Sequence, residues 1–245
     1  MQPSVISHNE SGVLTPALFH RVDTSYRKTY AFEGDFIDDF QRSLACLRLN
    51  ERGKTEFPFN FSNCLPAPEF RRVIVDLVKL YELAFFSTGN VIDLGTAHGR
   101  SSFVMSKALI ASGNRNSVHT IELSAKQNAI ALQNLKAFPH CSNVIFYQGS
   151  GHVVLKELLR QGSSADFVFV DHCHEFEEAA LTCALLDLII PTSGMALFHD
   201  YYDSRNFDPD NLEYNVVKGI EAGLDFTRFE PLGIFGSTGL FRRYR

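Results

Sequence analysis

Apolar and amphipathic segments alternate regularly from residue 90 onward, and this alternation predicts a repeating strand–helix order. Short continuous apolar runs are typical of parallel strands covered on both faces, while apolar residues three and four apart are typical of helices. The runs predict strands at residues 90–94, 117–123, 143–148, 165–171 and 195–200, with helices at 101–112, 124–138, 151–162 and 175–190 between them. The pattern therefore predicts a doubly wound α/β sheet, in which ligands bind at the carboxyl ends of the strands.

Two further strands are predicted at the C-terminus, after a helix at residues 211–224. They cover residues 226–232 and 237–245, and the stretch GIFGSTG between them is typical of a hairpin turn region. We therefore expect a mostly parallel seven-stranded sheet whose last strand runs antiparallel to the others.

The first 89 residues lack this alternation. Residues 1–27 are polar and aperiodic, and helical spacing of apolar residues appears over 36–47 and again over 70–81, with the second helix ending near Gly89. We predict an N-terminal arm and helical cap in residues 1–89, followed by a ligand-binding domain in residues 90–245.

Composition and charge narrow the function classes. The 245 residues carry a formal net charge of −5, with 45% hydrophobic and 21% charged residues, which argues against a protein that coats nucleic acid or an anionic membrane. No secretory signal or membrane-spanning stretch is expected from the pattern. The five cysteines are odd in number and form no C-x-x-C pair, which favours reduced thiols in a cytoplasmic setting.

The stretch VIDLGTAHGRSS at residues 91–102 predicts a strand that turns sharply into a helix. It is not a dinucleotide fingerprint, because Ala97 and Arg100 replace two of the required glycines, and it lacks the Gly-Lys-Ser/Thr of a phosphate loop. The pattern is Asp93-x-Gly95-x-x-x-Gly99, in which one glycine permits the turn and the other lets the helix begin close to a ligand.

Two later strand ends carry related features. Glu122 ends the second strand, where a carboxylate can accept both hydroxyls of a ribose, and QGSGH at residues 148–152 ends the third with small residues that can flank a flat base. Each has a structural alternative, a solvated strand end for Glu122 and a turn for Ser150. Three such features at consecutive strand ends favour a nucleotide-like ligand.

Over about residues 90–245 these features resemble the class I S-adenosylmethionine-dependent methyltransferases, whose seventh strand is also antiparallel. The resemblance implies that S-adenosylmethionine is the cofactor, with its methionine moiety in the glycine turn, its ribose at Glu122 and its adenine near Ser150. The cofactor-binding residues that it implies are Asp93, Gly95, Thr96, Ala97, Gly99, Ser101, Glu122, Ser150, Gly151, His152 and Asp171.

The ends of the fourth and fifth strands carry residues suited to catalysis. VDHCHEFE places Asp171 at one strand end, and FHDYYD places His199 and Asp200 at the next, so all three are expected to face the same cleft. Carboxylates and imidazole bind divalent cations, so Asp171 and Asp200, with His199 as a candidate third ligand, predict a metal site for Mg²⁺ or another divalent cation. For Asp171 the alternative is an N-cap of the following helix.

Here the resemblance narrows to catechol O-methyltransferase and its relatives, which have an Asp-His pair at the end of strand four like Asp171-His172. The stretches GTAHG and FHDY also resemble a natural-product group that includes macrocin O-methyltransferases and cephalosporin hydroxylase-like proteins. The catechol enzymes carry a catalytic lysine at the position of His174 and an Asp-Asn pair at the position of His199-Asp200. His174 is therefore a candidate general base that needs no metal. A zinc site at residues 172–174 is disfavoured because adjacent residues rarely converge on one ion.

The sequence thus predicts an S-adenosylmethionine-dependent O-methyltransferase (transferase class EC 2.1.1) that acts on a small hydroxylated metabolite or natural product. Its candidate catalytic residues are His174, Asp171 and His199. The alternative is a cofactor-binding protein of the same fold that transfers no methyl group or catalyses another reaction. We expect no nucleic-acid partner, and the resemblance suggests a homodimer. The acceptor pocket is expected in residues 28–70 and 201–212, where spacing carries no chemical code.

Overall fold

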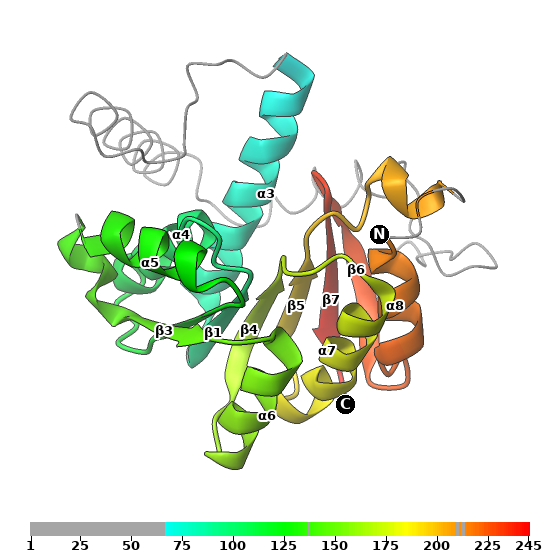
Figure 1. The fold of residues 1–245 in the computed structure, drawn as a ribbon. Coiled ribbons are helices and arrows are strands. Elements are labelled where there is room, and N and C mark those ends of the chain that lie inside the picture. The colour runs from blue at the N-terminus through cyan, green and yellow to red at the C-terminus, as the bar shows by residue number, and fades with distance from the viewer. Residues whose placement is uncertain (1–66, 137, 209–210, 212–213) are drawn as a thin grey trace, which may run out of the picture.

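The computed structural model describes residues 67–136, 138–208, 211 and 214–245. Its helices are α3 (Ala67–Phe86), α4 (Arg100–Ala111), α5 (Ala125–Lys136), α6 (Gly151–Arg160), α7 (Phe176–Ile189) and α8 (Val216–Gly223), with short 3-10 helices η1 (Pro139–Asn143) and η2 (Ser204–Phe207). Its strands are β1 (Asn90–Leu94), β2 (Val118–Glu122), β3 (Val144–Gln148), β4 (Ala165–Val170), β5 (Met195–Phe198), β6 (Phe229–Phe235) and β7 (Thr238–Arg243). Strands and helices alternate from β1 to β5, as the apolar pattern predicted (Figure 1).

The strands form one seven-stranded sheet in the order β3-β2-β1-β4-β5-β7-β6. The first five are mutually parallel, so their carboxyl ends meet at one edge of the sheet. From β1 the strand order continues outward to β2 and β3, and from β4 it continues in the opposite direction to β5. In a doubly wound sheet the point between these two halves, here between β1 and β4, opens a crevice for ligands.

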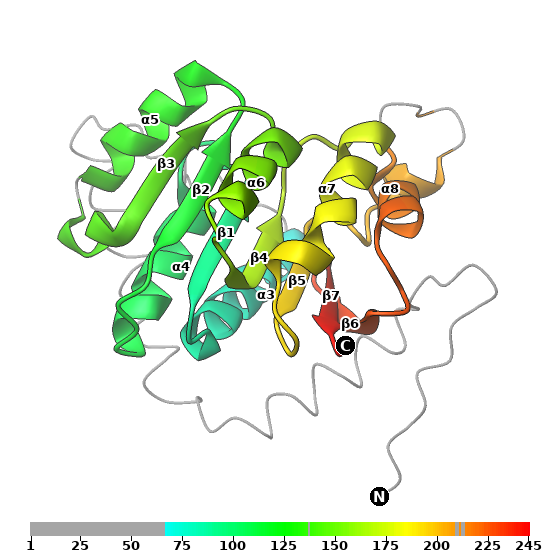
Figure 2. The same ribbon diagram turned by 90° about the horizontal axis from the view of Figure 1, so that it is seen from below.

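Helices cover both faces of the sheet (Figure 2). Along β1, Val91 contributes to a core with α3, α4 and α5, while Ile92 and Leu94 contribute to a second core with α6, α7 and α8. Because successive strand residues point to opposite faces, a strand buried on both sides needs apolar residues at every position. Asp93 is the polar exception among the buried positions 91–94 of β1, so its carboxyl group needs partners inside the protein.

The C-terminal strands pair as an antiparallel hairpin, and β7 lies between β5 and β6. The prediction of an antiparallel last strand is confirmed. The predicted turn region was too long, because β6 continues to Phe235 and the turn is made by Gly236 and Ser237.

Helix α8 begins later than residue 211, the predicted start. Tyr214 and Asn215 precede the helix, because the Asn215 backbone N–H donates to the carbonyl of His174 at 2.8 Å instead of continuing a helical turn. This contact joins the segment before α8 to the loop after β4.

The second predicted N-terminal helix is confirmed as α3, and Leu77, Leu80 and Tyr81 on it are buried. These residues share a core with Val91 of β1 and Phe103 of α4, so α3 packs directly on the sheet layer. The arm and the first predicted helix lie outside the described residues, and the domain division at residue 89 stays a prediction. None of the described helices has the length and apolar character needed to cross a membrane.

Candidate active site

A pocket of about 260 Å³ opens at the carboxyl ends of the central strands. One wall is the turn after β1 with Gly95, Thr96 and Ala97, and another is formed by Asp171 after β4 and His199 after β5. The pocket therefore lies at the switch point of the sheet and joins the predicted cofactor turn to two predicted catalytic residues. Ser101 and Arg100 of α4, and Asp76, Leu77 and Leu80 of α3, complete the described walls together with His98 and Phe169.

The glycines of the turn are required by contacts within the chain itself. Gly95 has φ +105°, and a Cβ there would lie 2.0 Å from the carbonyl oxygen of Asp171. Gly99 has φ +95° and is the N-cap of α4, where a Cβ would lie 3.2 Å from the Leu135 side chain of α5. Gly95 thus allows the turn after β1 to touch the end of β4, which sets the distance between the two walls of the pocket.

Asp93 anchors the start of α4 from inside the sheet layer. Its carboxylate accepts hydrogen bonds from Ser101 at 2.8 Å, from Ser102 and from Thr120 at 3.1 Å. Complete burial raises the pKa of Asp93 to about 7, although these three hydroxyls act in the opposite direction. Asp93 therefore supports the turn from behind and does not line the pocket.

Glu122 at the end of β2 contacts the same turn. Its carboxylate accepts a hydrogen bond from the backbone N–H of Ala97 at 2.9 Å and another from Ser124 N–H at 2.8 Å. A carboxylate has about four lone-pair sites, so each oxygen can still accept from a ribose hydroxyl. The geometry is compatible with the predicted ribose contact, which stays a prediction.

Ser150, Gly151 and His152 lie at the start of α6 and are tied to α7. Glu178 of α7 accepts from the Ser150 hydroxyl at 2.8 Å, and its other oxygen lies 2.9 Å from His152 Nδ1. A Cβ on Gly151 would lie 3.2 Å from the His172 ring. The predicted adenine-side residues therefore belong to one network that fixes α6 against α7.

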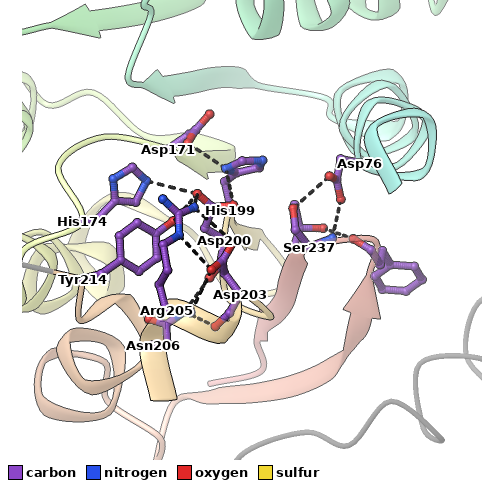
Figure 3. A network of polar contacts seen from close by, with 12 residues as sticks. Asp76, Asp171, His174, His199, Asp200, Asp203, Arg205, Asn206, Tyr214 and Ser237 are labelled. Carbon is purple, nitrogen blue, oxygen red and sulfur yellow. Dashed lines mark hydrogen bonds and ion pairs between the residues drawn. The ribbon is translucent and has the colours of Figure 1, made fainter. Parts of the chain in front are cut away.

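Asp171, His199 and Asp200 come together beside the pocket (Figure 3). His199 Nδ1 lies 3.0 Å from Asp171 Oδ1 and 3.3 Å from Asp200 Oδ1, as ion pairs without the alignment of a hydrogen bond. Burial by itself lowers the pKa of His199, but the two carboxylates outweigh it and hold this pKa well above the usual range. The arrangement is a histidine flanked by two acids.

His174, the candidate base, lies on the far side of Asp200 from this pocket. Its Nε2 is 3.4 Å from Asp200 Oδ2, and its ring stacks on Tyr214 with centroids 4.6 Å apart. The loop after β4 delays the start of α7, whose N-cap is Glu175, so the N-cap alternative for Asp171 is wrong. Of the candidate bases, His199 is the one that lines the pocket.

The predicted metal donors do not fit a cation in this arrangement. The His199 imidazole takes the position between Asp171 and Asp200 that a shared ion would need, and Asp200 also accepts from Tyr214 and pairs with Arg205. Within the described part of the chain, no three His, Cys, Asp or Glu side chains form a group that could hold a metal ion.

Several residues of the site were missed from the sequence. Arg100 was noted only because it breaks a dinucleotide fingerprint, and Leu77 and Leu80 were expected only as part of the cap helix over residues 70–81, yet all three line the pocket. Tyr214 and Arg205 have no motif at all, because their contacts to Asp200 come from the tertiary structure. Residues 201–208 are not among the described walls of this pocket, and most of residues 28–70 lie outside the described part, so their role in an acceptor pocket stays a prediction.

A family model described as a methyltransferase domain matches residues 92–201. Comparison with curated protein sequences finds no significant match. The O-methyltransferase TomG from Streptomyces achromogenes, in complex with SAM, has 17% identity, covers 92% of this chain and 96% of its own, and gives a TM-score of 0.60.

Two further solved structures have the same fold. An O-methyltransferase from Bacillus cereus in complex with SAH has 14% identity, covers 91% of this chain and 100% of its own, and gives a TM-score of 0.56. An SAH-bound methyltransferase from Podospora anserina has 16% identity, covers 88% of this chain and 98% of its own, and gives a TM-score of 0.57. The chain thus has the class I methyltransferase fold. Residues 92–201 match a methyltransferase domain, and together with the fold this supports the predicted class, an S-adenosylmethionine-dependent methyltransferase.

Proposed function

We propose that the chain transfers the methyl group of S-adenosylmethionine to a hydroxyl of a small metabolite or natural product. The observation that carries this proposal is the single pocket shared by the glycine turn, Asp171 and His199. The turn supports a cofactor site, and the acid–histidine pair supports proton removal at the same place. The SAM or SAH bound in TomG and in the Bacillus cereus enzyme supports the choice of cofactor.

In this proposal the glycine turn and α4 hold the methionine end of the cofactor, and Glu122 holds the ribose. The cofactor supplies a methyl group on a positively charged sulfur. Backbone N–H groups at the start of α4 are suited to the cofactor carboxylate, because a helix N-terminus favours an anion. Apolar Leu77, Leu80 and Phe169 would pack against the acceptor and keep water from the hydroxyl.

We propose His199 as the general base in place of His174. Its Nδ1 edge faces Asp171 and Asp200, which leaves Nε2 for the acceptor hydroxyl. Transfer would form the bond from the hydroxyl oxygen to the methyl carbon and break the carbon–sulfur bond, whose electron pair would return to the sulfur. Nε2 would take the hydroxyl proton, so the ring would become positively charged. The two carboxylates then stabilise that charge, while they also hold the ring in place.

We further propose that transfer does not depend on a divalent cation, because the imidazole lies where a shared ion would need to be. Exhaustive chelation should leave turnover within about twofold of the untreated protein. A loss of turnover that added Mg²⁺ restores would contradict this and would return Asp171 and Asp200 to the role of metal ligands.

The cofactor and the reaction are tested separately. Calorimetry should show that S-adenosylmethionine and S-adenosylhomocysteine bind, and protein purified without added cofactor should contain endogenous S-adenosylhomocysteine. Labelled cofactor with a panel of phenols, sugars and polyketides should then reveal an acceptor. Binding without transfer to any panel member would favour the alternative, a cofactor-binding protein that does not methylate these classes. Tighter binding of NADH than of S-adenosylmethionine would contradict the assignment of S-adenosylmethionine as the cofactor. A homodimer and a cytoplasmic location stay predictions.

A further inference from the structure

Tyr214, which has no sequence motif, contacts three of the charged or titratable side chains behind the pocket. Its hydroxyl donates to Asp200 Oδ2, and it accepts from Arg205 Nη2 at 3.0 Å. The Arg205 guanidinium lies 3.9 Å from the centre of the Tyr214 ring, and the His174 ring stacks on the same side chain. Figure 3 shows these groups converging on Asp200 from the loops after β4 and β5 and from the segment before α8.

Asp200 is held in an unusual conformation by these contacts. Its φ is +54°, a left-handed value that costs an aspartate free energy, and its backbone carbonyl accepts from Asn206 Nδ2 at 2.7 Å. Asn206 in turn accepts from the Val217 N–H of α8 at 3.2 Å. The Asn206 contacts therefore fix the backbone from which the Asp200 carboxylate projects.

The two oxygens of Asp200 have different partners. Oδ1 faces His199 Nδ1 at 3.3 Å, while Oδ2 receives the Tyr214 hydroxyl and lies within 3.4 Å of His174 and 3.6 Å of Arg205. Burial and the bond to Asp200 keep the pKa of Tyr214 above its usual range, so its hydroxyl stays a donor. Without that donor, rotation of the carboxylate toward His174 or Arg205 would withdraw Oδ1 from His199.

We propose that Tyr214 is a positioning residue for methyl transfer, which orients the Asp200 carboxylate and, through it, the His199 ring. The expected effect on kcat rests on the proposed function, whereas the orientation of His199 by Tyr214 through Asp200 does not. A purely structural role is the competing explanation, because Tyr214 is buried and its ring packs in the core beneath α8.

The test is Tyr214→Phe, which keeps the ring and removes only the hydroxyl. We expect kcat to fall roughly 5–50-fold, the effect of losing one hydrogen bond to a charged group that orients a catalytic side chain. The KM for S-adenosylmethionine should stay within about twofold, since the described partners of the hydroxyl, Asp200 and Arg205, are not part of the glycine turn. Tyr147→Phe is the matched control, because its hydroxyl also contacts a histidine, His119 at 2.9 Å, away from the pocket.

A double-mutant cycle with Asp200→Asn separates positioning from packing. If Tyr214 acts through Asp200, removing its hydroxyl from the Asp200→Asn protein should lower kcat less than twofold further. Multiplicative losses, or an unchanged kcat in Tyr214→Phe alone, would overturn the proposal.

A second readout does not depend on catalysis. Long-range ¹H–¹⁵N spectra of the histidine rings, with the His199 signal assigned from His199→Asn, report the hydrogen-bonded state of that ring. The His199 signal should shift in the same direction in Tyr214→Phe and in Asp200→Asn, and not in Tyr147→Phe. An unshifted His199 signal overturns the proposal, whereas a wild-type protein that methylates no acceptor contradicts the proposed function and leaves this spectral test decisive.

Discussion

The cofactor side and the catalytic side of the pocket are built in different ways. The cofactor side consists of turns that directly follow their strands, and its contacts involve the backbone, such as Gly95 against the Asp171 carbonyl and Glu122 against Ala97 N–H. The catalytic side consists of side chains from separate loops, with His199 between Asp171 and Asp200 and with Tyr214 behind them. A short motif can encode the first kind of site, whereas the second exists only after the chain has folded.

The largest expected effect on the catalytic side distinguishes the two candidate general bases, His199 and His174. His199→Asn should lower turnover roughly 10²–10⁴-fold, the usual contribution of a positioned base, with cofactor affinity nearly unchanged. His174→Asn is the matched control and should lower turnover far less, because His174 touches Asp200 and does not line the pocket. Steady-state kinetics and calorimetry measure both, and a larger loss in His174→Asn would restore His174 as the base.

The pH dependence of turnover is a second measurement of whether His199 is the general base. A base must be neutral to accept a proton, and the carboxylates around His199 favour its charged form, so they raise its pKa. Turnover should therefore rise with pH above the ordinary histidine value of about 6.5. Replacing one neighbour, in Asp200→Asn, should move the rise to lower pH, and an unmoved profile would contradict His199 as the titrating group.

The cofactor side is tested by comparing two glycines that both have positive φ. In Gly95→Ala the new Cβ would lie 2.0 Å from the Asp171 carbonyl oxygen, so we expect a loss of more than about 3 kcal/mol in the free energy of unfolding. Gly113 has φ +76°, and a Cβ added there would meet nothing within 4 Å, so Gly113→Ala should cost only about 1 kcal/mol. Denaturant titration measures both, and equal costs would show that the contact between β1 and β4 is not tight.

The fold was predictable because each element carries its own signal. The apolar runs at β1 to β5 and the helical spacing between them placed these elements within two residues of their bounds. The late start of α8 was not predictable, because it follows from the Asn215 contact with the loop after β4. Hydrogen bonds between distant segments leave no periodicity in the sequence.

The site was predictable only where its residues follow a strand directly. Strand ends predicted that Asp171, His199 and Asp200 would meet, and they do. The sequence did not indicate which histidine would face the pocket, since His174 and His199 both stand close to strand ends. The choice depends on the stacking of His174 against Tyr214, a contact across 40 residues with no local signal.

Asp93 provides a stability test of the cofactor side. Its pKa is raised from 3.8 to about 7, so its protonated form is favoured in the folded state. The folded protein therefore binds more protons than the unfolded chain between these values, and stability falls as pH rises from about 4 through 7, by roughly 4 kcal/mol at most. Asp93→Asn, which cannot ionise, should gain stability relative to the wild type between pH 5 and pH 8 in denaturant titrations.

Asp225→Asn is the matched control for that experiment. The Asp225 carboxylate is exposed and accepts from Thr227, which lowers its pKa, so the charged form is the favoured one. The Asn variant should then lose stability relative to the wild type as pH rises from acid to neutral, the opposite sign. The same sign in both variants would show that burial does not control the titration of Asp93.

The smallest expected effect belongs to Glu122, and it separates the two sides of the pocket most cleanly. Glu122→Ala removes the acceptor proposed for the ribose and should weaken S-adenosylmethionine binding by roughly 1–3 kcal/mol, the loss of charge-assisted hydrogen bonds. Because His199 and its carboxylates stay in place, kcat at saturating cofactor should change less than about threefold. Glu157→Ala on α6 is the control, since the described contacts of that carboxylate are with Arg160 and Gln161, whereas Glu122 accepts from Ala97 in the turn after β1. Unchanged affinity in calorimetry would remove Glu122 from the cofactor site, and a fall in kcat with unchanged affinity would mean that the turn after β1 positions the catalytic side as well.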